Sequence, residues 1–261
     1  MGTISSVHYS SYDLTPTTFP PGFTVSLIFL CNRSRTYEVF ATAGVFPVGE
    51  EGNGFTDVRL KQDEFESLRG TGDLAKNLNR VPVLNHNGFV LGQSTAIARY
   101  LGRHFGLYGR TLQEAAEIDA MMAHVDDVKN AWRKLFPYRV ELTDEQKAEN
   151  NKVWFDTPSE PPIEGRKERQ LQWFLEKIES VLPGDGYSVG GRPSIADAYW
   201  FNLLLEQAPE LEGSKGEGWF QNRAGTDRVL AMNPKLKNVV ETFKRSPGMA
   251  HWLSTRVVDT W

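Results

Sequence analysis

The chain has 261 residues, of which 40% are hydrophobic, and a formal net charge of −4. This length and apolar content allow one large or two modest domains with a substantial buried core. The acidic balance, without any long basic run, argues against nucleic-acid partners, because phosphate binding needs clustered Lys and Arg. No stretch reaches about 18 consecutive apolar residues, so the sequence predicts no membrane-spanning helix.

The N-terminal segment and the cysteine content indicate the compartment. Residues 1–22 are polar and proline-containing, and they lack the basic and apolar regions of a secretory signal. We expect a flexible extension there, with a clipped transit segment as the alternative. The one cysteine, Cys31, cannot form an internal disulfide, which favours a reducing compartment. We therefore expect a cytoplasmic location, with organelle targeting by the extension left open.

The first half of the chain predicts alternating strands and helices. Four apolar runs are strand candidates: 24–30, 55–60, 81–84 and 89–91. Three stretches have helical character: 34–43, a broken helix at 63–78, and 94–105. The last two strands are joined by Asn85-His86-Asn87-Gly88, whose Asn-Gly ending favours a tight hairpin turn. The predicted order is therefore β-α-β-α-β-β-α.

The second half of the chain, after Leu107, has helical character throughout. The candidate helices are 112–135, 163–182, 194–208, 234–244 and 249–257. Two segments rich in Gly, Pro and charge are expected to be surface loops: 156–165 and 210–226. In Ser194-Ile195-Ala196-Asp197, a hydroxyl at the N-cap and an acid at N3 are typical of a capping box. We expect an α/β domain over 23–106, a boundary near 106–111, and a helical domain over 110–261.

The segment from Asn79 to Leu101 contains the most informative motif. A proline, Pro82, interrupts a strand-like apolar run, and Gln93-Ser94 stands where a helix begins. Open backbone groups next to a helix N-terminus suit a small anionic peptide. The alternatives are an edge-strand proline without a ligand and a simple helix cap.

In combination, these motifs resemble those of the cytosolic glutathione transferase family, over about residues 24–257. The shared motifs are Val81-Pro82, Gln93-Ser94-x-Ala96-Ile97-x-x-Tyr100-Leu101 and the Ser194–Asp197 capping box. Leu107-Tyr108-Gly109 is more similar to the alpha, mu and sigma branch than to theta or omega members. The resemblance implies an α/β thioredoxin-like N-terminal domain, an all-α C-terminal domain, and glutathione as the co-substrate.

The resemblance also implies which residues hold glutathione. Pro82 would be cis, so that the backbone of Val81 faces outward and pairs with the cysteinyl part of glutathione like an added strand. Gln93 and Ser94 would hold the γ-glutamyl carboxylate, Ser94 with its hydroxyl and its N–H at the helix N-terminus.

Charged groups complete the implied glutathione site. Arg69 is the first candidate for the glycyl carboxylate and Arg80 the second, since Arg suits a bidentate contact; a solvated surface Arg is the alternative for each. In many family members, which are homodimers, an Asp of the partner subunit reaches the γ-glutamyl ammonium group. Here that position is Asp127, with Asp126 beside it, and an ordinary exposed acidic pair is the alternative.

The chain departs from the family at the group that activates the glutathione sulfur. The alpha, mu and sigma classes use a Tyr hydroxyl at the end of the first strand, and the corresponding residue here is Phe29. Cys31 falls where theta- and delta-like members have a Ser and near where omega-like members have a Cys. The helix predicted to start near Ser34, together with Arg33 and Arg35, would favour a thiolate, so Cys31, Ser34 and Arg35 are the catalytic candidates.

Three functions remain open. The first is a glutathione-dependent transferase, isomerase or lyase that acts on a small apolar electrophile and stabilises the thiolate without the usual Tyr. The second is a thiol oxidoreductase that uses Cys31, and the third is a non-catalytic glutathione-binding protein. We favour the first. The five histidines lack metal-ligand spacing, so no metal is expected, and the identity of the electrophile is not encoded in any motif.

Overall fold

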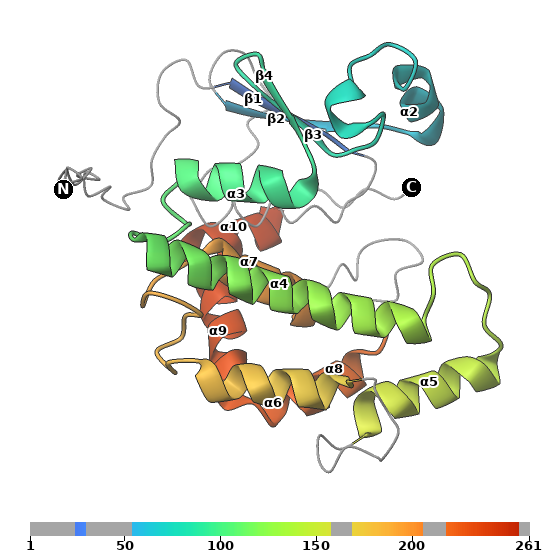
Figure 1. The fold of residues 1–261 in the computed structure, drawn as a ribbon, viewed down its shortest axis with the longest axis vertical. Helices are drawn as coiled ribbons and strands as arrows, with labels where there is room; N and C mark the ends of the chain where they lie inside the picture. Colours follow the sequence, from blue (N-terminus) through green and yellow to red (C-terminus); the bar gives the residue numbers. More distant parts are fainter. Residues whose placement is uncertain (1–23, 30–53, 158–168, 206–217, 256–261) are drawn as a thin grey trace, which may run out of the picture.

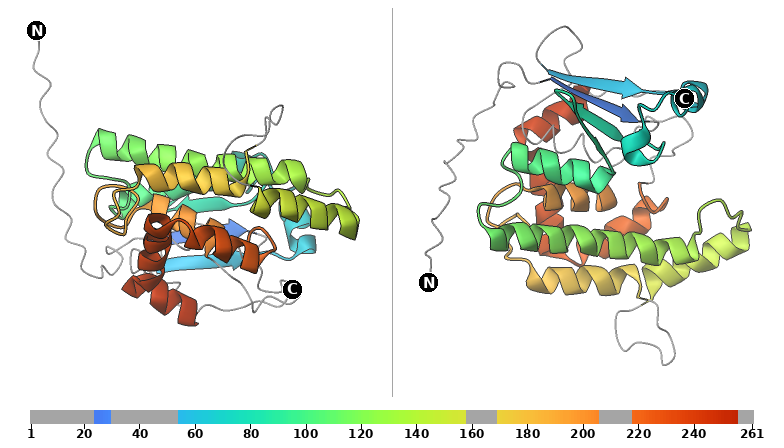
Figure 2. Two further views of the ribbon diagram at one scale, coloured as in Figure 1. Left: turned by 90° about the horizontal axis from the view of Figure 1, so that it is seen from below. Right: turned by 45° about the horizontal axis from the view of Figure 1, so that its top comes forward.

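A computed structural model describes residues 24–29, 54–157, 169–205 and 218–255 of the chain. The extension predicted at 1–22 and the helix predicted at 34–43 lie outside these ranges. Figure 1 shows a small sheet at one end of the molecule, helix α3 (Ser94–His104) beneath it, and a larger group of helices below α3. The right-hand view in Figure 2 shows the same order of layers.

The sheet has four strands, β1 (Thr24–Phe29), β2 (Gly54–Arg59), β3 (Val83–His86) and β4 (Phe89–Gly92). Their order is β2-β1-β3-β4, with β1 parallel to β2 and β3 antiparallel to both of its neighbours. Asn87 and Gly88 have φ angles of 49° and 87°, and positive φ at both turn positions is what a two-residue hairpin requires. The predicted hairpin is therefore confirmed.

Two of the predicted elements start or divide differently in the structure. The third strand starts at Val83 instead of Val81, because Pro82 has no N–H to donate to a strand ladder. The broken helix predicted at 63–78 consists of α2 (Gln62–Leu68) and a short 3-10 turn, η1 (Ala75–Asn77).

The helical layer contains α4 (Leu112–Leu135), α5 (Asp144–Asp156), α6 (Leu171–Val181), α7 (Ile195–Leu204), α8 (Arg223–Ala231), α9 (Pro234–Arg245) and α10 (Pro247–Thr255). Of the helix predicted at 163–182, residues 163–168 lie outside the described ranges, and α6 begins at Leu171 because the backbone of Gln170 is extended. The loop predicted at 210–226 ends earlier than expected: Asn222 accepts a hydrogen bond from the N–H of Gly225 and starts α8. Among the described residues, no helix is long and apolar enough to cross a membrane.

Helix α7 is the centre of the helical layer, since all ten of its residues are buried. The predicted capping box at its start is present. Asp197, 1% exposed, accepts hydrogen bonds from the N–H groups of Ser188 and Ser194, both at 2.8 Å, and from both serine hydroxyls. Burial raises the pKa of Asp197 to about 6, against the lowering effect of these hydrogen bonds.

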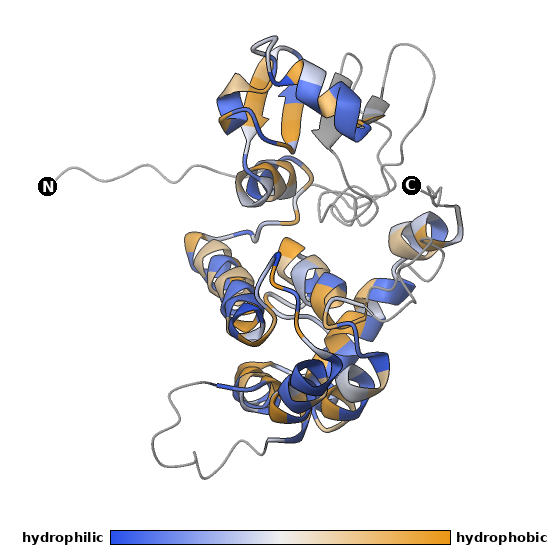
Figure 3. Ribbon diagram, turned by 90° about the vertical axis from the view of Figure 1, so that its right-hand side faces the viewer, coloured by the Kyte–Doolittle hydropathy of each residue, from blue (hydrophilic) through white to orange (hydrophobic). Residues whose placement is uncertain are grey.

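Helix α3 joins the sheet to the helical layer. A Cβ on Gly102 would lie 2.8 Å from the Ile195 side chain, so the glycine lets α3 approach the start of α7 closely. The carbonyl of Leu107 accepts a hydrogen bond from the N–H of Ile195 at 3.0 Å. Buried residues from Leu84 in β3 to Val240 in α9 form one continuous core. Figure 3 shows hydrophobic residues in orange both on the sheet and on the helices.

Candidate functional site

The turn before β3 presents backbone groups beside a proline. The Val81–Pro82 peptide bond is cis, as the resemblance implied. Val81 lies outside the strand ladder, and within the described residues its backbone makes no hydrogen bond to another backbone group. The register pairs Ile28 of β1 with Val83, so the chain leaves β1 next to this turn. An extended peptide has backbone groups available to pair with here.

The start of α3 lies directly after β4. Gln93 is exposed, and its φ of 72° and ψ of 114° are values that residues other than glycine rarely adopt. The first intrahelical bond runs from the N–H of Ile97 to the carbonyl of Gln93, so the N–H groups of Ser94, Thr95 and Ala96 precede it. The first turn contains no acidic residue, and the side chain of Gln93, the N-cap residue, does not cap it. This helix N-terminus is therefore suited to an anion.

The two candidate arginines differ in their surroundings. Arg69 follows α2 and forms an ion pair with Glu66 at 3.0 Å, and its guanidinium lies 5.6 Å from the centre of the Phe65 ring. Arg80 is exposed and directly precedes Val81, and its Nε donates to the Asn77 carbonyl at 3.3 Å. Arg80 thus belongs to the turn at the site, whereas a nearby carboxylate already pairs with Arg69.

Two histidines and a tyrosine pack at the far end of the β3–β4 hairpin. Nδ1 of His86 lies 2.6 Å from the Tyr100 hydroxyl, and the rings of His86 and His104 meet edge to face at 5.4 Å. Burial lowers the pKa of both histidines, and the proximity of His86 lowers that of His104 further. Neutral rings pack better than charged ones, so these contacts hold the hairpin against α3. No group of three or more metal-ligand side chains occurs in the described parts of the chain.

Comparisons with known proteins agree with this geometry. Residues 58–103 match the model of the glutathione S-transferase N-terminal domain, and residues 143–256 match that of the C-terminal domain. A probable glutathione S-transferase 7 of Caenorhabditis elegans is 33% identical over 207 residues, which cover 79% of this chain and 86% of that protein. The chain belongs to the glutathione transferase family.

Further relatives of this transferase carry two kinds of name. Rat hematopoietic prostaglandin D synthase is 28% identical over 205 residues, which cover 77% of this chain and 83% of that protein. The crystal structure of the glutathione S-transferase from Ascaris lumbricoides superposes with a TM-score of 0.61 and 22% identity, covering 91% of this chain and 100% of that one. The predicted fold, a thioredoxin-like domain plus an all-α domain, is confirmed, and so is a glutathione transferase-like enzyme.

The remaining predicted site residues are separate from this turn or outside the described ranges. Cys31, Ser34 and Arg35 fall in the segment that the structure does not describe, as does the side chain of Phe29. Asp127 is exposed on α4, and Asp126 is half-buried beside it. The reach of Asp127 into a partner's site stays a prediction.

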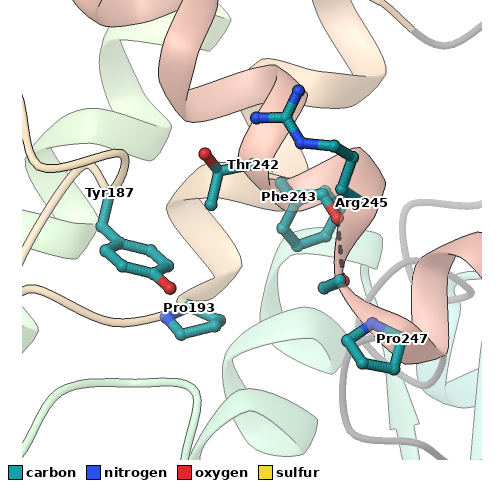
Figure 4. Close-up of a pocket in the computed structure, with 7 residues that line it drawn as sticks. Tyr187, Pro193, Thr242, Phe243, Arg245 and Pro247 are labelled. Atoms are coloured by element: carbon teal, nitrogen blue, oxygen red, sulfur yellow. Dashed lines mark hydrogen bonds between the residues drawn. The ribbon is translucent and has the colours of Figure 1, made fainter.

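A hollow lies in the helical half of the transferase, apart from the candidate site. It has a volume of about 340 Å³ and is lined by Tyr187, Pro193, Thr242, Phe243, Arg245, Ser246 and Pro247. Figure 4 shows these side chains around the junction of α9 and α10. Arg245 is paired with Glu241 at 3.3 Å, and of the predicted site residues that the structure describes, none lines this hollow.

Two residues of the site were missed by the sequence analysis. Asn77 is buried at the end of η1, and its Nδ2 donates to the Pro82 carbonyl at 2.8 Å. Gly92 lies so close to η1 that a Cβ there would be 2.6 Å from the Cβ of Asn77. The sequence contained one signal for each: an Asn-Leu-Asn run before Val-Pro, and a glycine at the end of a strand.

Proposed function

We propose that this transferase binds glutathione along Arg80–Pro82 and at the start of α3, and that it uses the glutathione thiolate to attack a small apolar electrophile. Transferase or isomerase activity in general follows from the family, whose members bind glutathione as co-substrate. The observation that carries the proposal is the adjacency of the two binding features, since Val83 pairs with Gly92: a Val81 backbone without a backbone hydrogen bond in the described residues, and a helix start at Ser94 that the Gln93 side chain does not cap.

Three groups divide the tripeptide between them in this proposal. The Val81 backbone pairs with the cysteinyl unit, and the N–H groups around Ser94 receive the γ-glutamyl carboxylate, with Gln93 beside them. Arg80 takes the glycyl carboxylate in preference to Arg69, because Arg80 already lies in the turn and, within the described residues, its terminal nitrogens make no hydrogen bond and can form a bidentate contact. We further propose a cytoplasmic homodimer in which Asp127 serves the site of the partner.

The sulfur is activated without a tyrosine in this proposal. Strand β1 ends at Phe29, next to the Val81–Pro82 turn. The residues that follow Phe29 in the sequence are therefore the candidates for contact with the sulfur of the bound cysteinyl unit. Cys31, Ser34 and Arg35 are the candidates that lower the pKa of the glutathione thiol, by hydrogen bonding or by positive charge. A lower thiol pKa and the held orientation of the two substrates together supply the rate enhancement.

Ser94→Ala is expected to raise the dissociation constant for glutathione about tenfold, which corresponds to about 1.4 kcal/mol, because a charge-assisted hydrogen bond is lost. Isothermal titration of glutathione into both proteins measures this. Thr111→Ala is the matched control, since Thr111 also starts a helix but its hydroxyl already accepts from Glu114. Equal glutathione affinity of Ser94→Ala and the unmodified protein would remove the basis for this binding site.

Cys31→Ser separates the transferase from the thiol oxidoreductase. If Cys31 only assists the glutathione thiolate, the variant is expected to keep glutathione binding and most of its conjugation rate with a reactive chlorodinitrobenzene. Exchange with a glutathione mixed disulfide is the second assay. Exchange that survives in Cys31→Ser rejects the oxidoreductase, whereas loss of exchange with conjugation retained would identify Cys31 as the nucleophile of the exchange.

A further inference from the structure

Asn77 contacts the proposed glutathione site from its buried side. Its side chain is 3% exposed, and Nδ2 donates to the carbonyl of Pro82 at 2.8 Å. The backbone carbonyl of Asn77 accepts from the N–H of Arg80 at 3.1 Å and from its Nε at 3.3 Å. The two residues that flank Val81 are therefore both bonded to Asn77.

Asn77 also abuts the strand that leads to α3. The space that a Cβ on Gly92 would occupy lies 2.6 Å from the Cβ and 2.8 Å from the Cα of Asn77. Gly92 directly precedes Gln93, so the position of η1 sets the distance between the Val81 turn and the helix start. One buried residue thus contacts both parts of the chain that the proposed function assigns to glutathione.

The backbone between η1 and Arg80 has an uncommon conformation that hydrogen bonds must stabilise. Leu78 and Asn79 both have positive φ, 54° and 55°, which is uncommon for residues other than glycine. Leu78 is 76% exposed and so gains little from burial. The N–H groups of Leu78 and Asn79 donate to the carbonyls of Ala75 and Leu74 at 2.9 and 3.0 Å, and the hydrogen bonds of Asn77 to Arg80 and Pro82 close the loop on its other side.

The side chain of Asn77 leaves one of its two polar groups unpaired. Its Oδ1 is buried and makes no hydrogen bond within the described residues. A buried unpaired acceptor is unfavourable, and an apolar side chain of the same shape does not incur that penalty. An amide at this position is explained if its donor is needed to fix the Pro82 carbonyl.

We infer that Asn77 is a positioning residue that holds Arg80, the Val81–Pro82 turn and the start of α3 at the spacing glutathione requires. This inference rests on the proposed function, because it assigns a role within the same site. Asn77 acts through Pro82 and Arg80 and does not touch the ligand. Its contribution is preorganisation: a turn that is already ordered loses less entropy when the peptide binds.

The test is Asn77→Leu, which keeps the shape of the side chain and removes its donor. The dissociation constant for glutathione, measured by isothermal titration, is expected to rise about tenfold, or about 1.4 kcal/mol. Asn233→Leu is the matched control: Asn233 is fully buried, its Nδ2 donates to the Val229 carbonyl at 2.8 Å, and its Oδ1 is also unpaired within the described residues. The control is expected to change thermal stability but not glutathione affinity.

The possible results of these titrations support or overturn the inference as follows. Weaker binding by Asn77→Leu but not by Asn233→Leu supports the inference. Unchanged affinity in Asn77→Leu, or equal losses in both variants, overturns it while leaving the proposed function intact. An unmodified protein that does not bind glutathione overturns both. If Asn77→Leu does not fold, Asn77→Ala replaces it, because the smaller side chain cannot collide with Gly92, and the same comparison applies.

Discussion

Asp197→Ala is expected to lower the free energy of unfolding by about 3–5 kcal/mol, because two buried N–H groups and two hydroxyls lose their acceptor and each unpaired buried group costs about 1–3 kcal/mol. For a protein of this size, the midpoint of thermal unfolding should fall by about 10 °C. The loss is large because the carboxylate joins the start of α7 to the loop at Ser188, and α7 is buried along its whole length.

Asp185→Ala is the control for this substitution, because Asp185 accepts one hydrogen bond, from the N–H of Tyr187, at the surface. Its expected loss is below about 1 kcal/mol. A thermal midpoint of Asp197→Ala that matches Asp185→Ala would show that the capping box contributes little.

The unmodified protein and Asp197→Ala are also expected to differ in how their stability depends on pH. Because burial raises the folded-state pKa of Asp197 from 3.8 to about 6, the folded protein binds this proton more tightly than the unfolded chain does. The stabilisation that comes from this tighter proton binding is fully present below about pH 4 and is lost as the pH rises through 6. It amounts to up to about 3 kcal/mol, at 1.36 kcal/mol per pKa unit. The stability advantage of the unmodified protein over Asp197→Ala should therefore grow between pH 7 and pH 4, as denaturant titrations at each pH will show.

Gly92→Ala is expected to weaken glutathione binding by well over tenfold. The new Cβ would lie 2.6–2.8 Å from the backbone and Cβ of η1, and backbone atoms cannot move aside as a flexible side chain can. Either η1 or β4 must shift, which costs about 1–3 kcal/mol of stability and moves the Val81 turn away from the helix start. Titration of glutathione together with a thermal scan separates the loss of affinity from the loss of stability.

Gly70→Ala is the matched control, because the nearest atom to a Cβ at Gly70 is the Ser67 carbonyl oxygen at 3.7 Å, an ordinary contact. It should behave like the unmodified protein in both measurements. If Gly92→Ala also binds glutathione normally, the close approach of η1 to β4 does not set the geometry of the site.

The parts of the fold that follow local rules were predictable from the sequence. The hairpin at Asn87-Gly88 and the capping box at Ser194–Asp197 depend on residues within a few positions of each other, and both were confirmed. The start of α8 at Arg223 was missed, because Asn222 is a single weak cap signal inside a stretch rich in Gly and charge. The extended backbone at Gln170, directly before α6, was missed because helical spacing does not mark where a backbone becomes extended.

The sequence predicted the site residues that belong to short motifs, but not those that act through tertiary contacts. Val81-Pro82 and Gln93-Ser94 are short patterns, and the structure brings them together at one end of the sheet. The roles of Asn77 and Gly92 depend on a tertiary approach between η1 and β4 that no spacing in the sequence encodes. The preference for Arg80 over Arg69 likewise needed the ion pair with Glu66 to be seen.

The contact between Gly102 and Ile195 lets α3 couple ligand binding at the sheet to the stability of the helical half. One end of this 11-residue helix is the proposed anion site, and the other end packs against the start of α7. A ligand that binds only the folded state stabilises every element that unfolds with its site. Glutathione bound at the sheet end would therefore also protect the helical half from proteolysis.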